Sequence, residues 1–114
     1  MKRVAIPIAQ GKLSPLFGQC NHYEIFDIED QEVLRDSIEI PPGKTLPELP
    51  EWAASQGITD VIVHKVDKQI IQLFSAFKIN LFVGIPMKAP REIIHDYLEG
   101  NLKSNSQVIT EIIN

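Results

Sequence analysis

The chain has 114 residues, of which 44% are hydrophobic and 23% are charged, and its formal net charge is −4. A globular chain of this length buries roughly 65% of its unfolded surface. The composition therefore predicts one folded domain and excludes a chain that is disordered throughout. No stretch gathers more than two adjacent basic residues. A protein that binds duplex nucleic acid needs a basic face, so nucleic acid is not an expected partner.

The N-terminal apolar run is broken by Pro7 and ends by Ala9. It is too short for the apolar region of a signal peptide and far too short to span a bilayer. The single cysteine, Cys20, excludes an internal disulfide and fits a reducing compartment. We therefore expect a cytoplasmic protein that does not insert into a membrane.

The first predicted element is a strand over residues 3–8, where most side chains are apolar, as in a strand covered on both faces. Pro7 cannot donate a backbone hydrogen bond, so it predicts either an edge strand or the end of this strand. Residues 9–18 hold two glycines and a Ser-Pro step, and they predict a loop.

Two β-like runs follow, over residues 22–28 and 32–40. The first alternates in character, and residues 29–31 suit a tight turn, so the pair predicts a β-hairpin. The Pro-Pro-Gly sequence at 41–43 then ends the second strand, because neither proline can donate to the ladder.

The second half of the chain alternates helical and strand-like patterns. Compact apolar runs at 59–64 and 81–84 predict two further strands. Three helices are expected: one over 51–56, with Pro50 in its first turn and Gly57 after its end, one capped by Asp67, and one that starts at Pro90 and ends before Gly100.

The resulting order, β-β-β-α-β-α-β-α, predicts an α/β fold. Strands that alternate with helices pair in parallel through right-handed crossovers, while the hairpin adds antiparallel strands, so we expect a three-layer mixed sheet. Residues 1–102 form the predicted domain. Residues 103–114 form a C-terminal tail, which could be a short helix, a strand added to an edge, or a frayed end. Its apolar side could cover a neighbour, so both a monomer and a homodimer are open.

Several local features resemble a known family. They are the N-terminal apolar strand, the run Ser14-Pro15-Leu16-Phe17-Gly18, the hairpin, and the closing run Asp96-Tyr97-Leu98-Glu99-Gly100-Asn101-Leu102. With their order, they make residues 1–102 similar to the dinitrogenase iron-molybdenum cofactor biosynthesis domain of the NifX and NafY type. The resemblance implies a ribonuclease-H-like fold. It also implies a non-enzymatic protein that binds or carries an iron-molybdenum or other metal–sulfur cofactor, with a cluster-assembly or acceptor protein as a partner.

Two positions depart from that family's pattern. Leu16 stands where family members usually carry a histidine, and residues 64–67 read His-Lys-Val-Asp where members tend to have a glycine-rich turn. Both lie where the family's ligand site is expected. They favour an alternative function, a regulatory or protein-interaction module on the same fold that has lost the metal site.

Ligands of open α/β sheets bind beyond the carboxyl ends of the parallel strands. The loop after the first strand and the turn at 64–67 are expected there together. Within that loop, Cys20 and His22 are two residues apart, so in an extended segment their side chains point the same way. A thiolate and an imidazole suit iron, zinc or copper, and Cys20 and His22 are the candidate metal ligands. The family resemblance suggests a preassembled cluster whose remaining positions are filled by its own sulfides.

His64 ends a buried strand and is a further candidate for cofactor binding. Each of these residues also has a purely structural interpretation. Cys20 can be a small buried apolar residue, and His22 can simply begin a strand. His64 can face solvent and form a hydrogen bond with a neighbouring carbonyl.

Ser14, Phe17 and Gly18 complete the candidate cofactor-binding residues. Gly18 can adopt a positive φ and let the chain turn into the hairpin, and Phe17 is expected to pin the loop to the core. The backbone N–H groups of residues 11–18 could also bind an anion.

A small hydrolase with Cys20 as nucleophile and His22 or His64 as base is a third hypothesis. No third orienting group is visible in the sequence. The first strand also lacks the acidic residue with which a ribonuclease-H-type nuclease holds metal ions. We therefore expect a protein that is not an enzyme.

Overall fold

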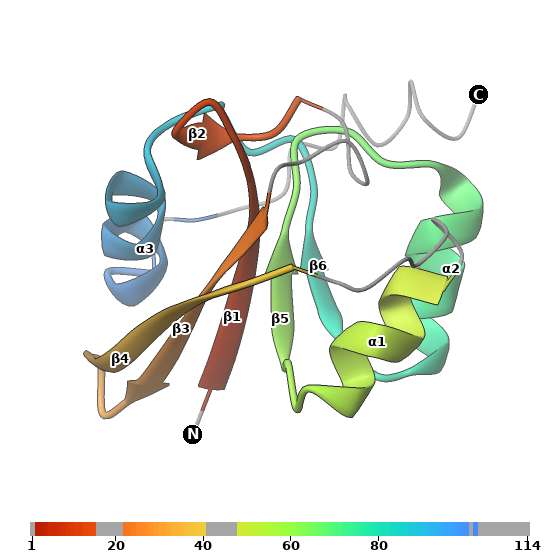
Figure 1. The fold of residues 1–114 in the computed structure, drawn as a ribbon, viewed down its shortest axis with the longest axis horizontal. Coiled ribbons are helices and arrows are strands. Elements are labelled where there is room, and N and C mark those ends of the chain that lie inside the picture. The colour runs from red at the N-terminus through yellow and green to blue at the C-terminus, as the bar shows by residue number, and fades with distance from the viewer. Residues whose placement is uncertain (1, 16–21, 41–47, 101, 103–114) are drawn as a thin grey trace.

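The computed structural model describes residues 2–15, 22–40, 48–100 and 102. Its strands are β1 (Lys2–Ala9), β2 (Lys12–Leu13), β3 (His22–Glu29), β4 (Glu32–Glu39), β5 (Asp60–Ile62) and β6 (Asn80–Phe82). They form one six-stranded sheet in the order β4-β3-β1-β5-β6, with β2 paired to β1 outside this path (Figure 1). The neighbours β1, β5 and β6 are parallel, whereas β3 is antiparallel to both β1 and β4.

Three helices cover the two faces of this sheet. The helices α1 (Leu49–Ser55) and α2 (Lys68–Ala76) lie on one face, and α3 (Pro90–Leu98) lies on the other (Figure 1). The predicted three-layer mixed α/β architecture is confirmed, and it is consistent with a ribonuclease-H-like fold. The predicted helices and strands all occur, with bounds that differ by a few residues.

Pro7 lies in a central strand, so the expectation of an edge strand is wrong. The parallel pairing of β1 with β5 ends at Ala5, and the Pro7 carbonyl accepts a hydrogen bond of 2.8 Å from the Ser14 backbone N–H. Pro7 therefore lies where β1 stops pairing with β5 and begins to pair with β2. A missing N–H is tolerated at that junction because the regular ladder is interrupted there.

The strand β2 falls within the predicted loop at 9–18 and adds one strand to the expected order. Gln10 and Gly11 have φ values of 55° and 77°. Two consecutive left-handed residues form the tight turn that joins antiparallel strands. This turn folds the chain back, so that Leu13 pairs with Ile8.

The helix ends follow the predicted capping residues. Asp67 is the N-cap of α2, where its backbone carbonyl accepts hydrogen bonds from Ile70 and Ile71. Pro50 lies in the first turn of α1, and Gly57, with φ of 75°, follows its C-terminal end. A proline at the start and a left-handed glycine just past the end are the usual signals for a short helix.

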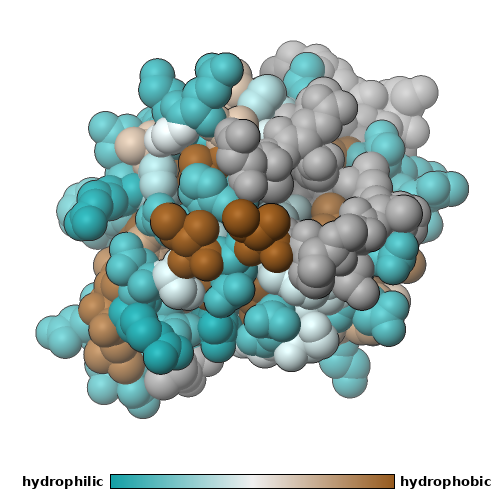
Figure 2. Space-filling model, in the orientation of Figure 1, coloured by the Kyte–Doolittle hydropathy of each residue, from teal (hydrophilic) through white to brown (hydrophobic). Residues whose placement is uncertain are grey.

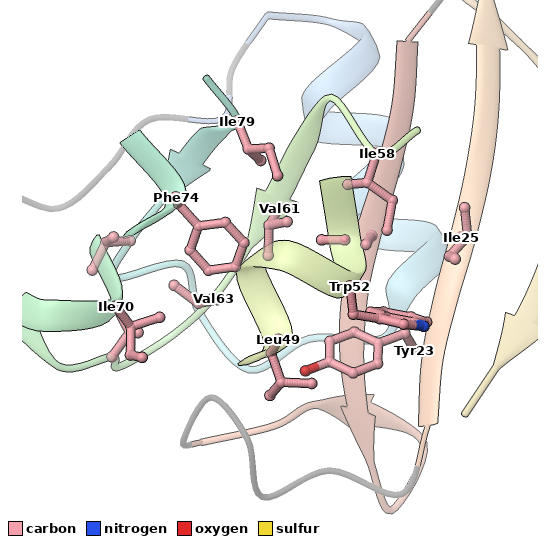
Figure 3. Close-up of a cluster of buried hydrophobic side chains, with 14 residues drawn as sticks. Tyr23, Ile25, Leu49, Trp52, Ile58, Val61, Val63, Ile70, Phe74 and Ile79 are labelled. Carbon is pink, nitrogen blue, oxygen red and sulfur yellow. The ribbon is translucent and has the colours of Figure 1, made fainter. Parts of the chain in front are cut away.

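Two hydrophobic clusters fill the space between the sheet and its helices. Along β1, β3 and β5, successive buried side chains belong alternately to one cluster and to the other, because a pleated strand points them to opposite faces of the sheet. The cluster beneath α1 and α2 is drawn in Figure 3, and the other lies beneath α3. Trp52 is buried and packs against Tyr23 with ring centroids 5.4 Å apart.

Asp60 is a buried carboxylate at the start of β5, with 2% exposure. Its Oδ1 accepts a hydrogen bond from Asn80 Nδ2 (3.0 Å), and its Oδ2 accepts from the hydroxyls of Thr59 (2.7 Å) and Tyr97 (3.2 Å). A buried charge is tolerated when hydrogen bonds replace its lost hydration. This network joins β5 to β6 and to α3, so the role of Asp60 is structural.

Burial, the negative charge of Asp60 and the hydrogen bond to it together raise the pKa of Tyr97 to about 12. This folded-state pKa lies above the ordinary value of about 10. The resulting stabilisation is therefore fully present below about pH 10 and is lost as the pH rises through about 12. We expect phenolate absorbance in a Tyr23→Phe background, where Tyr97 is the remaining tyrosine, to titrate near 12. Adding Asp60→Asn should lower the midpoint while burial continues to raise it, and an unchanged midpoint would contradict the contribution assigned to Asp60.

Among the residues that the structure describes, no helix is long and apolar enough to cross a membrane.

Candidate functional site

The chain segments that follow β1, β5 and β6 meet at one end of the sheet, along the top of Figure 1. Because the three strands are parallel, their carboxyl ends share this end. The Leu13 backbone N–H donates to the Lys88 carbonyl (3.0 Å), and the Gly84 N–H donates to the His64 carbonyl (3.0 Å). The segment after β6 therefore links the loop after β1 to the turn after β5, and the expectation that these two lie together is met. We call this region the carboxyl edge, defined by Leu13, Ser14, His22, His64 and Ile85.

Ser14 is positioned by the β1–β2 hairpin. Ser14 is 1% exposed, and its backbone N–H donates a hydrogen bond to the Pro7 carbonyl. It thus lies at the carboxyl edge, as predicted, but as an anchored residue of the hairpin rather than on the surface of a loop.

His64 is oriented by a backbone carbonyl. Its Nδ1 lies 2.9 Å from the Ile85 carbonyl oxygen. A carbonyl can only accept, so Nδ1 carries the proton, and in the neutral ring Nε2 keeps a free lone pair. This is the arrangement by which proteins orient a metal-ligating histidine. The structural interpretation of His64, a bond to a neighbouring carbonyl, is borne out, and it is compatible with a ligand role.

His22 begins β3 and lies at the same end of the sheet. It pairs with Ile8, the residue that also pairs with Leu13 on the other side of β1. Its side chain is half-buried and alternates with Tyr23, whose ring belongs to the cluster under α1 and α2. His22 therefore points to the α3 side of the sheet.

Glu24 lies two residues after His22 and on the same face of β3. Burial is the main cause that raises the pKa of Glu24, followed by the negative charge of Asp36; His22 and Arg91 oppose the rise. The pKa of Glu24 is therefore influenced by groups of β3, β4 and α3. The alternation of the sequence could have identified Glu24 as a neighbour of His22, but its partners Asp36 and Arg91 come from segments far along the chain.

Three predicted cofactor-binding residues, Phe17, Gly18 and Cys20, lie outside the described residues, as does Leu16. Of the predicted set, the structure brings Ser14, His22 and His64 to the carboxyl edge. The segment after β6, with Ile85 and Lys88, is the part of this region that the sequence did not single out. Its signal is weak, because its contributions are backbone carbonyls that any residue could supply.

Within the described ranges, no three His, Cys, Asp or Glu side chains gather so as to hold a metal ion. The donor set that Ser14, His22 and His64 offer is therefore not by itself a site for a bare ion. Imidazole nitrogens do suit a cluster that brings its own sulfides and leaves few positions for protein ligands.

Two surface grooves lined by described residues lie away from the carboxyl edge. One, of about 490 Å³, lies between the β3–β4 turn and the C-terminal end of α3. The other, of about 440 Å³, lies between β4 and α3. The candidate site and these grooves therefore belong to different parts of the surface.

The fold and the carboxyl edge define a class of protein, an α/β domain whose mixed sheet brings the carboxyl ends of β1, β5 and β6 to one edge. The comparison with known families is more specific, because residues 1–100 match the family described as dinitrogenase iron-molybdenum cofactor. The chain belongs to this family, and the resemblance stated from its sequence is confirmed.

Individual proteins are similar to this chain in sequence or in fold. An uncharacterized protein of Methanocaldococcus jannaschii, MJ0580, is 26% identical over 108 residues, which cover 90% of this chain and 91% of that protein. The crystal structure of PH0822 is similar with a TM-score of 0.82 and 24% identity, over 90% of this chain and 94% of that one. The apo form of the orange protein from Desulfovibrio gigas is similar with a TM-score of 0.77 and 15% identity, over 93% and 94% of the two chains. Both structural likenesses show the fold.

Proposed function

We propose that this chain binds a metal–sulfur cofactor, of the iron-molybdenum type or another, at the carboxyl edge, and carries it without transforming it. The observation that carries the proposal is the family match over residues 1–100. It is supported by the orientation of His64, whose Nδ1–H bonds to Ile85 and leaves Nε2 for a ligand.

Cys20 and His22 are the proposed metal ligands in this function, and His64 lines the same site. Ser14 anchors the hairpin that starts the binding loop, and Phe17 and Gly18 belong to that loop. Residues 1–102 are the proposed binding domain, with 103–114 as a tail. The thiol of Cys20 requires a reducing environment to act as a ligand, which fits a cytoplasmic carrier that exchanges its cluster with an assembly or acceptor protein.

The test is anaerobic mixing of the purified chain with isolated iron-molybdenum cofactor, followed by gel filtration, visible absorbance and metal analysis. We expect iron and molybdenum to elute with the protein. A Cys20→Ser, His22→Ala variant should lose them, and His64→Ala should weaken binding by at least about tenfold, as removal of metal-orienting groups does.

The matched control is His95→Ala, which removes the third histidine of the chain. His95 is an exposed residue of α3 whose Nε2 lies 3.3 Å from a carboxylate oxygen of Glu99, on the solvent-facing side of the helix. It should bind the cofactor like the wild type. Equal binding by all the variants would show that the metal is held elsewhere, and the absence of binding by the wild type would overturn the proposal.

A second candidate function is a regulatory or interaction module that has lost the metal site. Leu16 in place of a histidine, and a turn at 64–67 without glycine, favour it. Purification of the tagged chain from its native cells separates the two functions. A stable partner protein without bound metal supports the module, whereas bound iron or molybdenum supports the carrier.

A further inference from the structure

The strand β4 ends the path β4-β3-β1-β5-β6, so within the described part of the chain one of its edges has no neighbouring strand. In Figure 1 it passes in front of the other strands. Figure 2 shows the same face, with hydrophobic atoms exposed in the middle of it, along the course of β4. This free edge is separate from the carboxyl edge proposed for cofactor binding.

The free edge carries exposed apolar side chains among charged ones. Six large hydrophobic side chains are exposed in the described residues, and four of them lie in or next to β4: Val33 (41%), Leu34 (55%), Ile38 (62%) and Ile40 (70%). Residues 32–40 contain neither lysine nor proline, two common protections of an edge strand, although they include four charged residues and a register shift against β3. Exposed apolar side chains along an edge strand favour its pairing with another strand.

The direction of the backbone groups along β4 follows from the sheet register. The Arg3 carbonyl accepts a hydrogen bond from the Thr59 backbone N–H, so the backbone groups of Arg3 face β5. The backbone groups of successive residues point to opposite sides of a strand, so those of Val4 face β3. Val4 pairs with Phe26, so the next residue of β3, Ile25, faces β4.

Ile25 pairs with Ser37, whose backbone groups therefore point inward. The N–H and C=O groups of the flanking residues Asp36 and Ile38 point outward, to the free edge. These are the groups available to a new strand.

We propose that β4 pairs with β4 of a second copy of this chain, antiparallel, about a twofold axis at Ser37. A twofold axis perpendicular to the sheet places one residue opposite itself. In the register centred on Ser37, Asp36 and Ile38 exchange backbone hydrogen bonds across the interface. The same register sets Arg35 opposite Glu39, which joins cation to anion. Leu34 lies at the register shift between Arg35 and Val33, so the regular pairing ends at Arg35.

Other twofold registers are less complementary. Centring on Arg35 or on Asp36 sets like charges directly opposite each other, which destabilises a sheet. Centring on Ile38 sets Ser37 opposite Glu39 and moves Arg35 beyond the described strand. The Ser37 register also leaves the hydrogen bond from Arg35 Nη2 to Asp27 Oδ2 (2.9 Å) in place. That bond joins two side chains on one face of the sheet and does not use the backbone groups of the free edge.

The sharpest test uses a cysteine at the axis. A residue that faces itself in a non-hydrogen-bonded pair has its two Cα atoms about 4.5 Å apart, which is within disulfide range. In a Cys20→Ser background, Ser37→Cys should form a covalent dimer under mild oxidation. Glu32→Cys, on the same strand but distant from its own copy in this register, is the matched control and should not. Equal cross-linking of the two variants would overturn the register.

Sedimentation equilibrium measures the association itself. The wild type should shift from monomer to dimer mass as its concentration rises. Glu39→Lys sets a cation opposite Arg35 of the second copy and should raise the dissociation constant about tenfold. Glu32→Lys makes the same charge change outside the proposed pairing between the two copies and should leave the dissociation constant unchanged. Ile38→Pro removes an outward N–H without breaking the β3–β4 ladder and should also weaken the dimer. A wild type that stays monomeric, with no cross-link at position 37, would overturn the proposal.

Discussion

Replacing Phe74 by alanine is expected to lower the free energy of unfolding by about 3–5 kcal/mol, the usual cost of deleting a buried aromatic ring. Phe74 lies on α2 with 1% exposure and points into the cluster drawn in Figure 3. Its loss would remove contacts with side chains from β5, α1 and the segments around them. For a domain whose total stability is about 5–15 kcal/mol, such a loss leaves little reserve.

The matched control is Phe77→Ala, which deletes the same ring from the end of the same helix. Phe77 is 41% exposed, so its replacement should cost far less, about 1 kcal/mol or under. Urea unfolding followed by the fluorescence of Trp52, the single tryptophan of the chain, measures the free energy of unfolding of both variants. Trp52 belongs to the same cluster as Phe74, so its fluorescence reports on this core. Equal losses of stability would contradict the assignment of Phe74 to the centre of this core.

Asp60→Asn is expected to cost about 1.5–3 kcal/mol, because it removes a charged acceptor from a buried network. The aspartate receives hydrogen bonds from Asn80, Thr59 and Tyr97. An asparagine of the same shape has one acceptor oxygen in place of two, and Asn80 or a hydroxyl must reorient to accept from its N–H₂ group. The charge-assisted hydrogen bonds of the aspartate are thereby replaced by weaker neutral ones.

Asp96→Asn makes the same chemical change on the surface and serves as the control. Asp96 pairs with Lys88 at 3.4 Å with both side chains partly exposed. Exposed pairs of this kind contribute at most about 1 kcal/mol. Thermal or urea unfolding at neutral pH compares the two variants, and a loss in Asp60→Asn no greater than in Asp96→Asn would show that the network does not hold the sheet to α3.

These two predictions separate the stability of the fold from its function. Phe74 and Asp60 lie away from the carboxyl edge, so their variants test the scaffold. Variants of Cys20, His22 and His64 test cofactor binding, and variants of Glu39 and Ser37 test the association of two chains. Cofactor binding and association can each be lost while the fold is kept, whereas loss of the fold removes both.

Part of the candidate site was predictable from the sequence. The rule that ligands bind beyond the carboxyl ends of parallel strands directed attention to the loop after β1 and the turn after β5, and hydrogen bonds through the segment after β6 join them. The hydrogen bond of His64 to a nearby carbonyl was one of its two expected roles. That the carbonyl belongs to Ile85 depends on the parallel placement of β6, which no local pattern contains.

Local sequence determined the secondary structure of this protein. Pro50 and Gly57 mark helix ends because each has a backbone preference that its neighbours do not change. Asp67 is the N-cap of α2 as its residue type predicts, although its side chain makes no capping hydrogen bond. The alternation along β3 assigned Tyr23 and Ile25 to one face, since a strand can bury a side chain only on the face to which the pleat points it.

Only the tertiary structure decided which segments became neighbours. It placed Pro7 in a central strand, brought Tyr97 to Asp60 across 37 positions of the chain, and left β4 at the end of the strand order among the described residues. The physical reason is that backbone preferences act over a few residues, whereas strand order and burial are set by the best packing of distant apolar faces against one another.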